Sequence, residues 1–114
     1  MTKNLSINLL NKTKDDFLME METVFGFPSW WGRNTDAMYD CLSTLRGPIG
    51  DEMTSFVLSF DDYIILEVNN TSFARFNVNE SLYEVIAGIN QFFYDTVSCP
   101  ITIMLLLKNG LKDN

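Results

Sequence analysis

Two aspartates and a tyrosine are the residues of this chain most able to do chemistry. Asp36 and Asp40 stand four positions apart, and Tyr39 lies beside the second of them. On a helix this spacing places both carboxylates on one face, one turn apart. Paired carboxylates can bind a divalent cation, act in general acid–base catalysis, or pair with the basic groups of another protein. The pattern alone leaves these three functions open.

Residues 34–45 are predicted to form a helix with two distinct faces, capped by Asn34 or Thr35. One face is apolar and should pack on the core: Ala37, Met38, Cys41, Leu42 and Leu45. The opposite face carries Asp36, Tyr39, Asp40 and Ser43. Like charges one turn apart destabilise a helix by ~0.2–0.5 kcal/mol. The helix dipole favours Asp36 in the first turn but gives no such support to Asp40, so folding alone supplies no reason for Asp40.

The loop before this helix contains two adjacent tryptophans, Trp30 and Trp31, followed by Gly32. Two such large side chains are difficult to bury together in so small a domain. Gly32 permits a turn with positive φ or a close approach of the backbone. An exposed aromatic beside paired carboxylates is typical of a protein-binding hot spot.

The charge and composition narrow the class of partner. The chain has 114 residues with a net charge of -7, which opposes direct nucleic-acid binding and favours a basic protein as ligand. It contains no histidine, so catalysis by Ser-His-Asp or Cys-His groups is excluded. Cys41 and Cys99 match neither a metal site nor a disulfide framework and are expected to be buried free thiols. We therefore predict a protein that is not an enzyme and that uses no metal or cofactor.

The organisation predicted is one domain over residues 1–114, with a frayed tail at 108–114. No apolar run approaches the ~20 residues of a membrane span, and the N-terminus lacks the apolar centre of a signal peptide. We therefore expect a cytoplasmic protein that does not contact membranes and is a monomer when free.

Strands and helices alternate along the predicted chain. Apolar patterns predict strands at 5–9, 64–68 and 101–107, and helices at 14–25, 34–45 and from a cap at Asn79 or Ser81 to about 95. A short helix is expected within 72–77. Residues 51–63 are left open, because residues 56–60 fit either an additional edge strand or an ordered loop. This order predicts a small α/β domain with a three-stranded parallel sheet and right-handed crossover helices.

At this point the sequence resembles the barstar family, the intracellular inhibitors of barnase-type secreted ribonucleases. The segment that carries the resemblance is FPSWWGRNTDAMYDCL, residues 27–42. It fits a family pattern of two aromatics, Gly, Asn, Asp-Ala, an aromatic and Asp-Cys-Leu. Cys99 before the last strand also resembles the second thiol of that family. The resemblance implies a barstar-like fold and an intracellular inhibitor of a basic secreted or toxin ribonuclease.

The resemblance also implies roles for individual residues. Asp40 would be the main charged anchor in the phosphate-binding site of the ribonuclease, and Asp36 a second carboxylate for basic groups. Tyr39 would be the packing aromatic, in place of the more usual tryptophan. Trp30 would cover the mouth of the active site, and Trp31 would pack inward. Gly32 and Asn34 would shape the loop. The partner-binding set is Trp30, Gly32, Asn34, Asp36, Tyr39, Asp40 and Ser43.

This chain departs from the family pattern in three places. Arg33 stands where family members often carry an acidic residue, which implies selection of a different enzyme or repulsion of barnase itself. The segment IAGINQFFYDTVSC, residues 86–99, does not reproduce the acidic contribution of that region, although Asp95 lies within it. The segment from Gly47 to Tyr63 is longer than the minimal family form.

Three alternatives accompany the inhibitor interpretation. A barstar fold could serve as an immunity or interaction protein whose partner is not a ribonuclease. Asp36 and Asp40 could form a catalytic or cation-binding pair, but no further oxygen ligand at a recognisable spacing accompanies them. The tryptophans could stack on nucleic-acid bases, but Arg33 is the only cation near them before Arg46, and the net charge opposes such binding.

Overall fold

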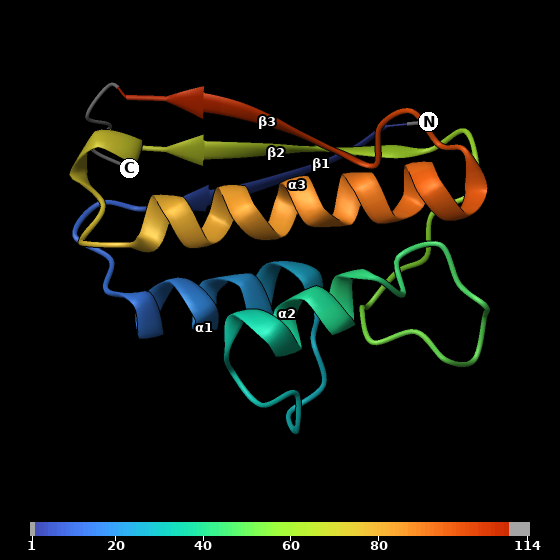
Figure 1. Cartoon of the computed structure of the whole chain (residues 1–114). Helices are drawn as coiled ribbons and strands as arrows, with labels where there is room; N and C mark the ends of the chain where they lie inside the picture. The colour runs from blue at the N-terminus through green and yellow to red at the C-terminus, as the bar shows by residue number, and fades with distance from the viewer. Residues whose placement is uncertain (1, 110–114) are drawn as a thin grey trace.

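The computed structural model describes residues 2–109, which form a three-stranded sheet with the helices packed on one side of it (Figure 1). The strands are β1 (Thr2–Asn8), β2 (Tyr63–Asn69) and β3 (Ile103–Lys108), in the order β1-β2-β3 and parallel throughout. The helices are α1 (Lys14–Phe25), α2 (Thr35–Leu42), the 3-10 turn η1 (Thr71–Phe73) and α3 (Val78–Val97). The predicted α/β domain with three parallel strands is therefore confirmed.

Within residues 2–109, helices cover one face of the sheet and leave the other open. Alternate residues of β2 are buried, and these residues, Ile64, Leu66 and Val68, point toward the helices. The opposite face keeps Met104 and Leu106 of β3 exposed, at 42% and 46%. The core is consequently a single layer between the sheet and the helices. Helix α2 packs its apolar face on this layer, and its polar face points toward solvent.

The boundaries of α1 follow from its sequence. Thr13 and Asp16 form a capping box at its start, where each side chain accepts a hydrogen bond from the backbone N–H of the other residue. Gly26 ends the helix with φ 70° and donates its N–H to Glu22 O at 2.8 Å. A Cβ at position 26 would lie 2.4 Å from Ser55 Cβ, so this position requires glycine for its conformation and for its space.

Of residues 51–63, which the sequence left open, 51–62 form a loop that adds no strand, and Tyr63 is the first residue of β2. The backbone N–H groups of this loop donate hydrogen bonds to the last residue of α1 and to the turn after α2, and not to a neighbouring strand. Ser55 N–H donates to Phe25 O at 2.9 Å, and Leu58 N–H donates to Leu45 O at 2.6 Å. The Arg46 guanidinium also donates to Ser59 O and Asp62 O, at 2.5 and 2.8 Å. These bonds order the segment without extended pairing.

Two predicted helix boundaries were wrong. The α-helix α2 ends at Leu42 and not at Leu45, because the chain tightens to bonds of the i to i−3 type, such as Leu45 N–H to Leu42 O at 3.1 Å. Helix α3 begins at Val78, after Asn77 in the left-handed conformation, so neither Asn79 nor Ser81 is its cap. Asn79 instead donates to Thr71 O at 2.8 Å, and Ser81 is buried within the helix.

The C-terminal strand begins and ends later than predicted. Thr102 and Ile103 donate their N–H groups to Asn90 Oδ1, at 3.0 and 2.8 Å, so Ile101 and Thr102 precede the strand. Lys108 was predicted to belong to the frayed tail, but it is the last residue of β3 and its Nζ lies 2.8 Å from Glu67 Oε1. Asn109 accepts hydrogen bonds from the Thr71 hydroxyl and the Ser72 N–H. The rest of the predicted tail, 110–114, lies outside the described residues.

Candidate protein-binding site

The loop between α1 and α2 is held in place by the second tryptophan. Trp31 is only 3% exposed, and its indole N–H donates to Glu22 Oε1 at 2.6 Å. Its ring packs on Phe27, with centroids 4.8 Å apart. The expectation that Trp31 packs inward is therefore confirmed, and α1 supplies the carboxylate that its indole needs once it is buried.

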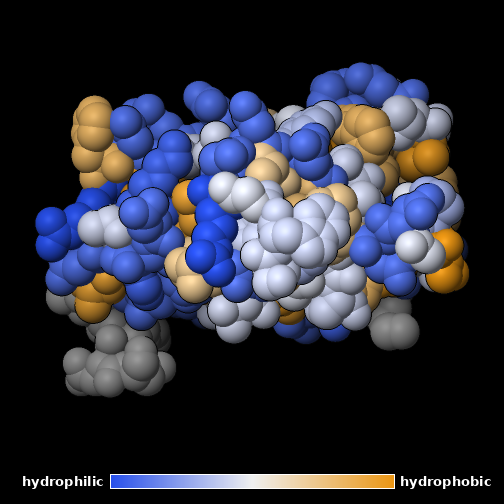
Figure 2. Space-filling model, turned by 90° about the horizontal axis from the view of Figure 1, so that it is seen from below, coloured by the Kyte–Doolittle hydropathy of each residue, from blue (hydrophilic) through white to orange (hydrophobic). Residues whose placement is uncertain are grey.

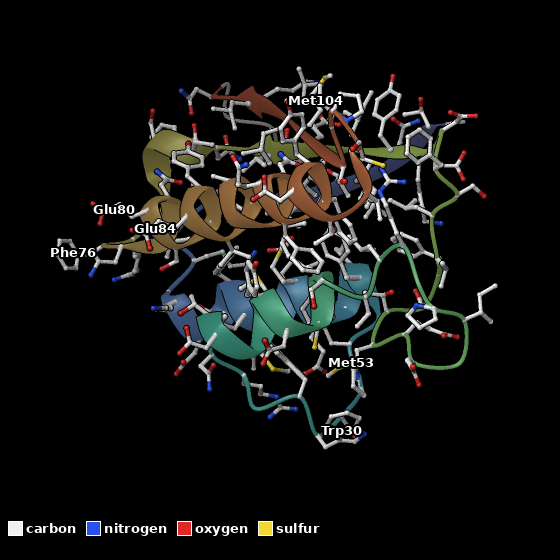
Figure 3. The ribbon with its side chains drawn as sticks, turned by 45° about the vertical axis from the view of Figure 1, so that its right-hand side comes forward. Trp30, Met53, Phe76, Glu80, Glu84 and Met104 are labelled. Atoms are coloured by element: carbon white, nitrogen blue, oxygen red, sulfur yellow. The ribbon has the colours of Figure 1, made fainter. Side chains whose placement is uncertain are left out.

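The first tryptophan projects from the same loop. Trp30 is 71% exposed and lies at the far tip of the loop in Figure 3. Gly32 has φ 91°, a conformation that favours glycine, and it turns the chain back toward α2. A hollow of about 280 Å³ lies beside Trp30, lined by Ser29, Gly32 and Arg33. The face of the molecule seen in Figure 2 combines hydrophilic side chains with a pale area of intermediate hydropathy near its centre.

Asn34 starts α2. Its side-chain oxygen accepts the Ala37 N–H at 2.7 Å, which makes it the N-cap. Its amide nitrogen lies 3.5 Å from Gly32 O, so the same side chain also contacts the turn. Asn34 therefore joins the loop that carries Trp30 to the helix that carries the aspartates.

The polar face of α2 follows the helical spacing. Asp36 lies in the first turn and Asp40 is exposed one turn later. The Ser43 hydroxyl donates to Asp40 O at 2.6 Å. Among residues 2–109, the ion pairs are Lys12–Glu20, Arg33–Glu22 and Lys108–Glu67, so neither Asp36 nor Asp40 is neutralised by a cation of its own chain. Both carboxylates remain available to groups outside the molecule.

Tyr39 connects this face to α3. It is partly buried against the core, and its ring meets that of Phe92 edge-on at 6.3 Å. A Cβ at Gly88 would come within 3.1 Å of Tyr39 Cε2, so α3 needs a very small residue where the tyrosine crosses it. Tyr39 thus packs sideways within its own protein, and this contact fixes the position of α2.

Two glutamates on α3 extend the acidic surface, and the sequence interpretation missed them. Glu80 and Glu84 are exposed, and both lie on the stripe that continues to Gly88 in steps of four. Because Gly88 faces Tyr39, Glu84 lies one turn away on the side of α3 that borders α2. The two helices lie side by side in Figure 1, and Figure 3 labels Glu84. Phe76, 87% exposed, lies next to them. The spacing of Glu80, Glu84 and Gly88 was the signal that could have found this stripe.

The pKa shifts around the site have local causes. The indole N–H of Trp31 and then the guanidinium of Arg33 lower the pKa of Glu22. Burial, and secondarily the charge of Asp40, raises the pKa of the Cys41 thiol to about 11. Cys41 therefore stays protonated near neutral pH and is not an activated nucleophile. Cys41 and Cys99 are both free and buried, as predicted.

No metal cluster accompanies the aspartates. Across residues 2–109, no three His, Cys, Asp or Glu side chains come together in a way that could hold a metal ion. In the same part of the chain, no helix has the length and apolar character to cross a bilayer. The geometry places an exposed aromatic ring, Trp30, and two exposed carboxylates, Asp36 and Asp40, on the surface of a small α/β domain.

Comparison with known proteins identifies the family to which this chain belongs. Residues 7–92 match the family model described as Barstar (barnase inhibitor). The chain therefore belongs to the Barstar family, whose members are inhibitors of barnase-type ribonucleases and not enzymes. A search of curated proteins found no match to this chain.

Proposed function

We propose that this protein inhibits a basic, secreted or toxin ribonuclease by inserting the polar face of α2 into its active site. The observation that carries the proposal is that Asp36 and Asp40 stand on one helix face without a cation from their own chain, within the described residues 2–109. Other carboxylates of the protein, such as Glu20, Glu22 and Glu67, are paired internally.

The mechanism is substitution of a carboxylate for a phosphate. A ribonuclease cleft must carry Arg, Lys or His to hold its substrate, and a carboxylate on a rigid helix can accept charge-assisted hydrogen bonds from the same groups. Asp40 is the anchor, Asp36 is the second carboxylate, and Ser43 adds a hydroxyl at the end of the face. The net charge of -7 raises the rate of encounter with a basic protein.

The loop supplies the remaining contacts. Trp30 covers the mouth of the cleft with a large exposed ring, while Gly32 and Asn34 set its position and offer backbone contacts. Tyr39 contributes the edge of its partly buried ring and holds α2 against α3. Glu84 borders the same surface and would face basic groups at its rim.

The test is a capture experiment with matched baits. Wild type, Asp40→Ala and the control Asp51→Ala, which removes an exposed carboxylate from the loop after α2, are used to pull down partners from the source cell and its secreted proteins. A ribonuclease recovered by wild type and Asp51→Ala, but not by Asp40→Ala, supports the proposal. Its activity should fall when wild type is added back.

Two results would overturn the proposal. One is recovery of the same partner by all three baits, since Asp40 would then have no role as an anchor. The other is a partner that is not a nuclease, which would make the protein an immunity or interaction protein of the same fold. Circular dichroism of each bait shows whether a lost interaction comes from unfolding.

A further inference from the structure

In the part of the chain that the structure describes, the edge of the sheet formed by β3 is apolar and largely uncovered. Met104, Leu106 and Leu107 are 42%, 46% and 49% exposed, and no charged residue occurs from 101 to 107. The other edge differs, because β1 is rich in polar residues and the Lys3 ammonium lies 4.3 Å from the centroid of Phe56 in the neighbouring loop. Exposed apolar edge strands are uncommon, because their free backbone groups can pair with strands of other molecules. Lysine side chains on the edge normally prevent such pairing.

The hydrogen-bond pattern shows which backbone groups face that open edge. Thr102 O accepts from Ile64 N–H at 2.9 Å, and Lys108 O accepts from Asn70 N–H at 2.6 Å. Even-numbered residues of β3 therefore point their backbone groups toward β2, and Ile103, Leu105 and Leu107 point theirs outward. Asn90 takes both groups of Ile103, because Oδ1 accepts its N–H at 2.8 Å and Nδ2 donates to its C=O at 2.9 Å. Within residues 2–109, the backbone groups of Leu105 and Leu107 have no such cover.

We propose that this edge is a self-association surface, on which β3 of a second copy pairs antiparallel to form a continuous six-stranded sheet. A two-fold axis makes such a pairing antiparallel. The backbone N–H and C=O of Ile103 are already bonded to Asn90, so only those of Leu105 and Leu107 are open to a second strand. The antiparallel register that pairs them is centred on Leu106. Leu105 of each copy then faces Leu107 of the other, and the two residues exchange both backbone hydrogen bonds.

Side chains on both faces of β3 suit this register. On the helix side, a groove of about 430 Å³ is lined by Tyr83, Ile86, Ala87, Leu105 and Leu107. On the open side, a hollow of about 390 Å³ is lined by Phe60, Asp61, Asp62, Ile101 and Met104. The two strands would place their apolar side chains alternately against these surfaces.

Charge complementarity favours a second copy over another strand. In the Leu106-centred register, position 108 of one copy faces position 104 of the other on the open face of the sheet. Lys108 of each copy pairs with its own Glu67 at 2.8 Å, and this register also brings it to the mouth of the hollow where Asp61 of the other copy lies near Met104. The edge itself carries no acidic residue, so the negative charge of the chain does not meet at the contact.

The dimer is expected to be weak and to leave the α2 face open. A contact made of two hydrogen-bonded residue pairs and short flanking grooves buries much less surface than the ~1,200–2,000 Å² of a stable interface. Met104 and Trp30 lie at opposite ends of the molecule in Figure 3. This inference does not depend on the proposed inhibitor function. It means that the free protein is a monomer, as expected from the sequence, only at low protein concentration.

The first test is sedimentation equilibrium of the whole chain from about 1 µM to 1 mM. The weight-average mass should rise from 13.1 kDa toward twice that value. Leu106→Lys places two like charges across the two-fold axis and should weaken association at least ~10-fold. The matched control Met19→Lys makes the same change at an α1 residue of similar exposure, 43%, and should associate like wild type. A wild type that stays at 13.1 kDa throughout would overturn the proposal.

A crosslinking test reports the register and does not require Leu106→Lys to fold. In the proposed dimer, residues 106 form a non-hydrogen-bonded pair with Cα atoms about 4.5 Å apart, within reach of a disulfide. Leu106→Cys should therefore crosslink when oxidised glutathione is added. Met104→Cys should not crosslink. Residue 104 is also on the edge strand, but in this register it faces residue 108 of the second copy and lies four positions from residue 104 of that copy. Equal crosslinking of both variants, or none for Leu106→Cys, would refute this register and the proposal with it. The native thiols are buried and do not interfere.

Discussion

Two neighbouring residues of the same type have opposite surroundings in this protein. Trp31 is 3% exposed and hydrogen-bonded to Glu22, whereas Trp30 is 71% exposed at the tip of the loop. The difference arises from the chain on either side. Gly26 closes α1 and directs Phe27 and Trp31 inward, and Gly32 then turns the backbone toward α2. Trp31 is thus a residue of the fold, while Trp30 is a residue of the surface.

The comparison shows how a small domain can hold an exposed loop in place without a disulfide. The loop is fixed from beneath by Trp31 and at its end by the Asn34 cap. The exposed ring of Trp30 is therefore held close to one position before a partner arrives, which reduces the entropy lost on binding. If this division of roles is correct, substitutions at the two tryptophans should affect different measurements.

The largest effect is expected for Trp31→Ala. Removing this buried ring leaves a cavity beside Phe27 and leaves Glu22 without its indole donor, so the free energy of unfolding should fall by about 3–5 kcal/mol. Urea denaturation followed by circular dichroism measures the change. The control is Trp30→Ala, and an equal loss of stability in both variants would remove the distinction between the two residues.

Trp30→Ala should act on binding. Because the ring is exposed, the free energy of unfolding should stay within about 0.5 kcal/mol of wild type. Affinity for the captured ribonuclease should fall at least ~10-fold, as for an aromatic hot spot. Titration calorimetry provides the measurement, with Phe60→Ala as a control at an exposed aromatic, 59%, away from α2. Unchanged affinity would exclude Trp30 from the interface.

Features encoded by local patterns could be predicted from the sequence. The bounds of α1, Lys14–Phe25, followed from the Thr13 cap, the apolar spacing and the closing glycine. The face of α2 that carries Asp36 and Asp40 followed from helical periodicity. The inward position of Trp31 was implied by the family resemblance, but its hydrogen-bond partner, Glu22, was not identified.

Features that depend on distant contacts could not be predicted in the same way. The start of α3 uses Asn77 in the left-handed conformation, which no side-chain cap signals. The course of residues 51–62 depends on bonds to Phe25 and Leu45. The place of Glu84 beside α2 depends on the contact of Gly88 with Tyr39, residues far apart in sequence. Periodicity identifies the faces of a helix but does not say which neighbour each face meets.

The bond between Trp31 and Glu22 should make stability depend on pH. The pKa of Glu22 is lowered from 4.5 in the fold, so its contribution is fully present above that value and is lost as pH falls through the lower, folded pKa. Glu22→Gln keeps an oxygen acceptor but cannot titrate. The difference in melting temperature between wild type and Glu22→Gln should therefore shrink as the pH falls below about 4.5. A constant difference would mean that the charge of Glu22 does not support Trp31.

The smallest effect is expected for Arg33→Ala. Arg33 Nε lies 3.2 Å from Glu22 Oε1, but the arginine side chain is 53% exposed, and exposed ion pairs contribute only ~0.2–1 kcal/mol. Stability should change by less than about 1 kcal/mol, because Trp31 keeps its bond to the same oxygen. Arg33 is also the cation nearest to Trp30 in sequence, so its removal should raise the association rate with a basic ribonuclease about 2-fold at low salt. Stopped-flow association at two salt concentrations tests this, since an electrostatic gain must diminish as salt rises. A loss of stability as large as that of Trp31→Ala would mean that the ion pair, and not the buried indole, fixes the loop.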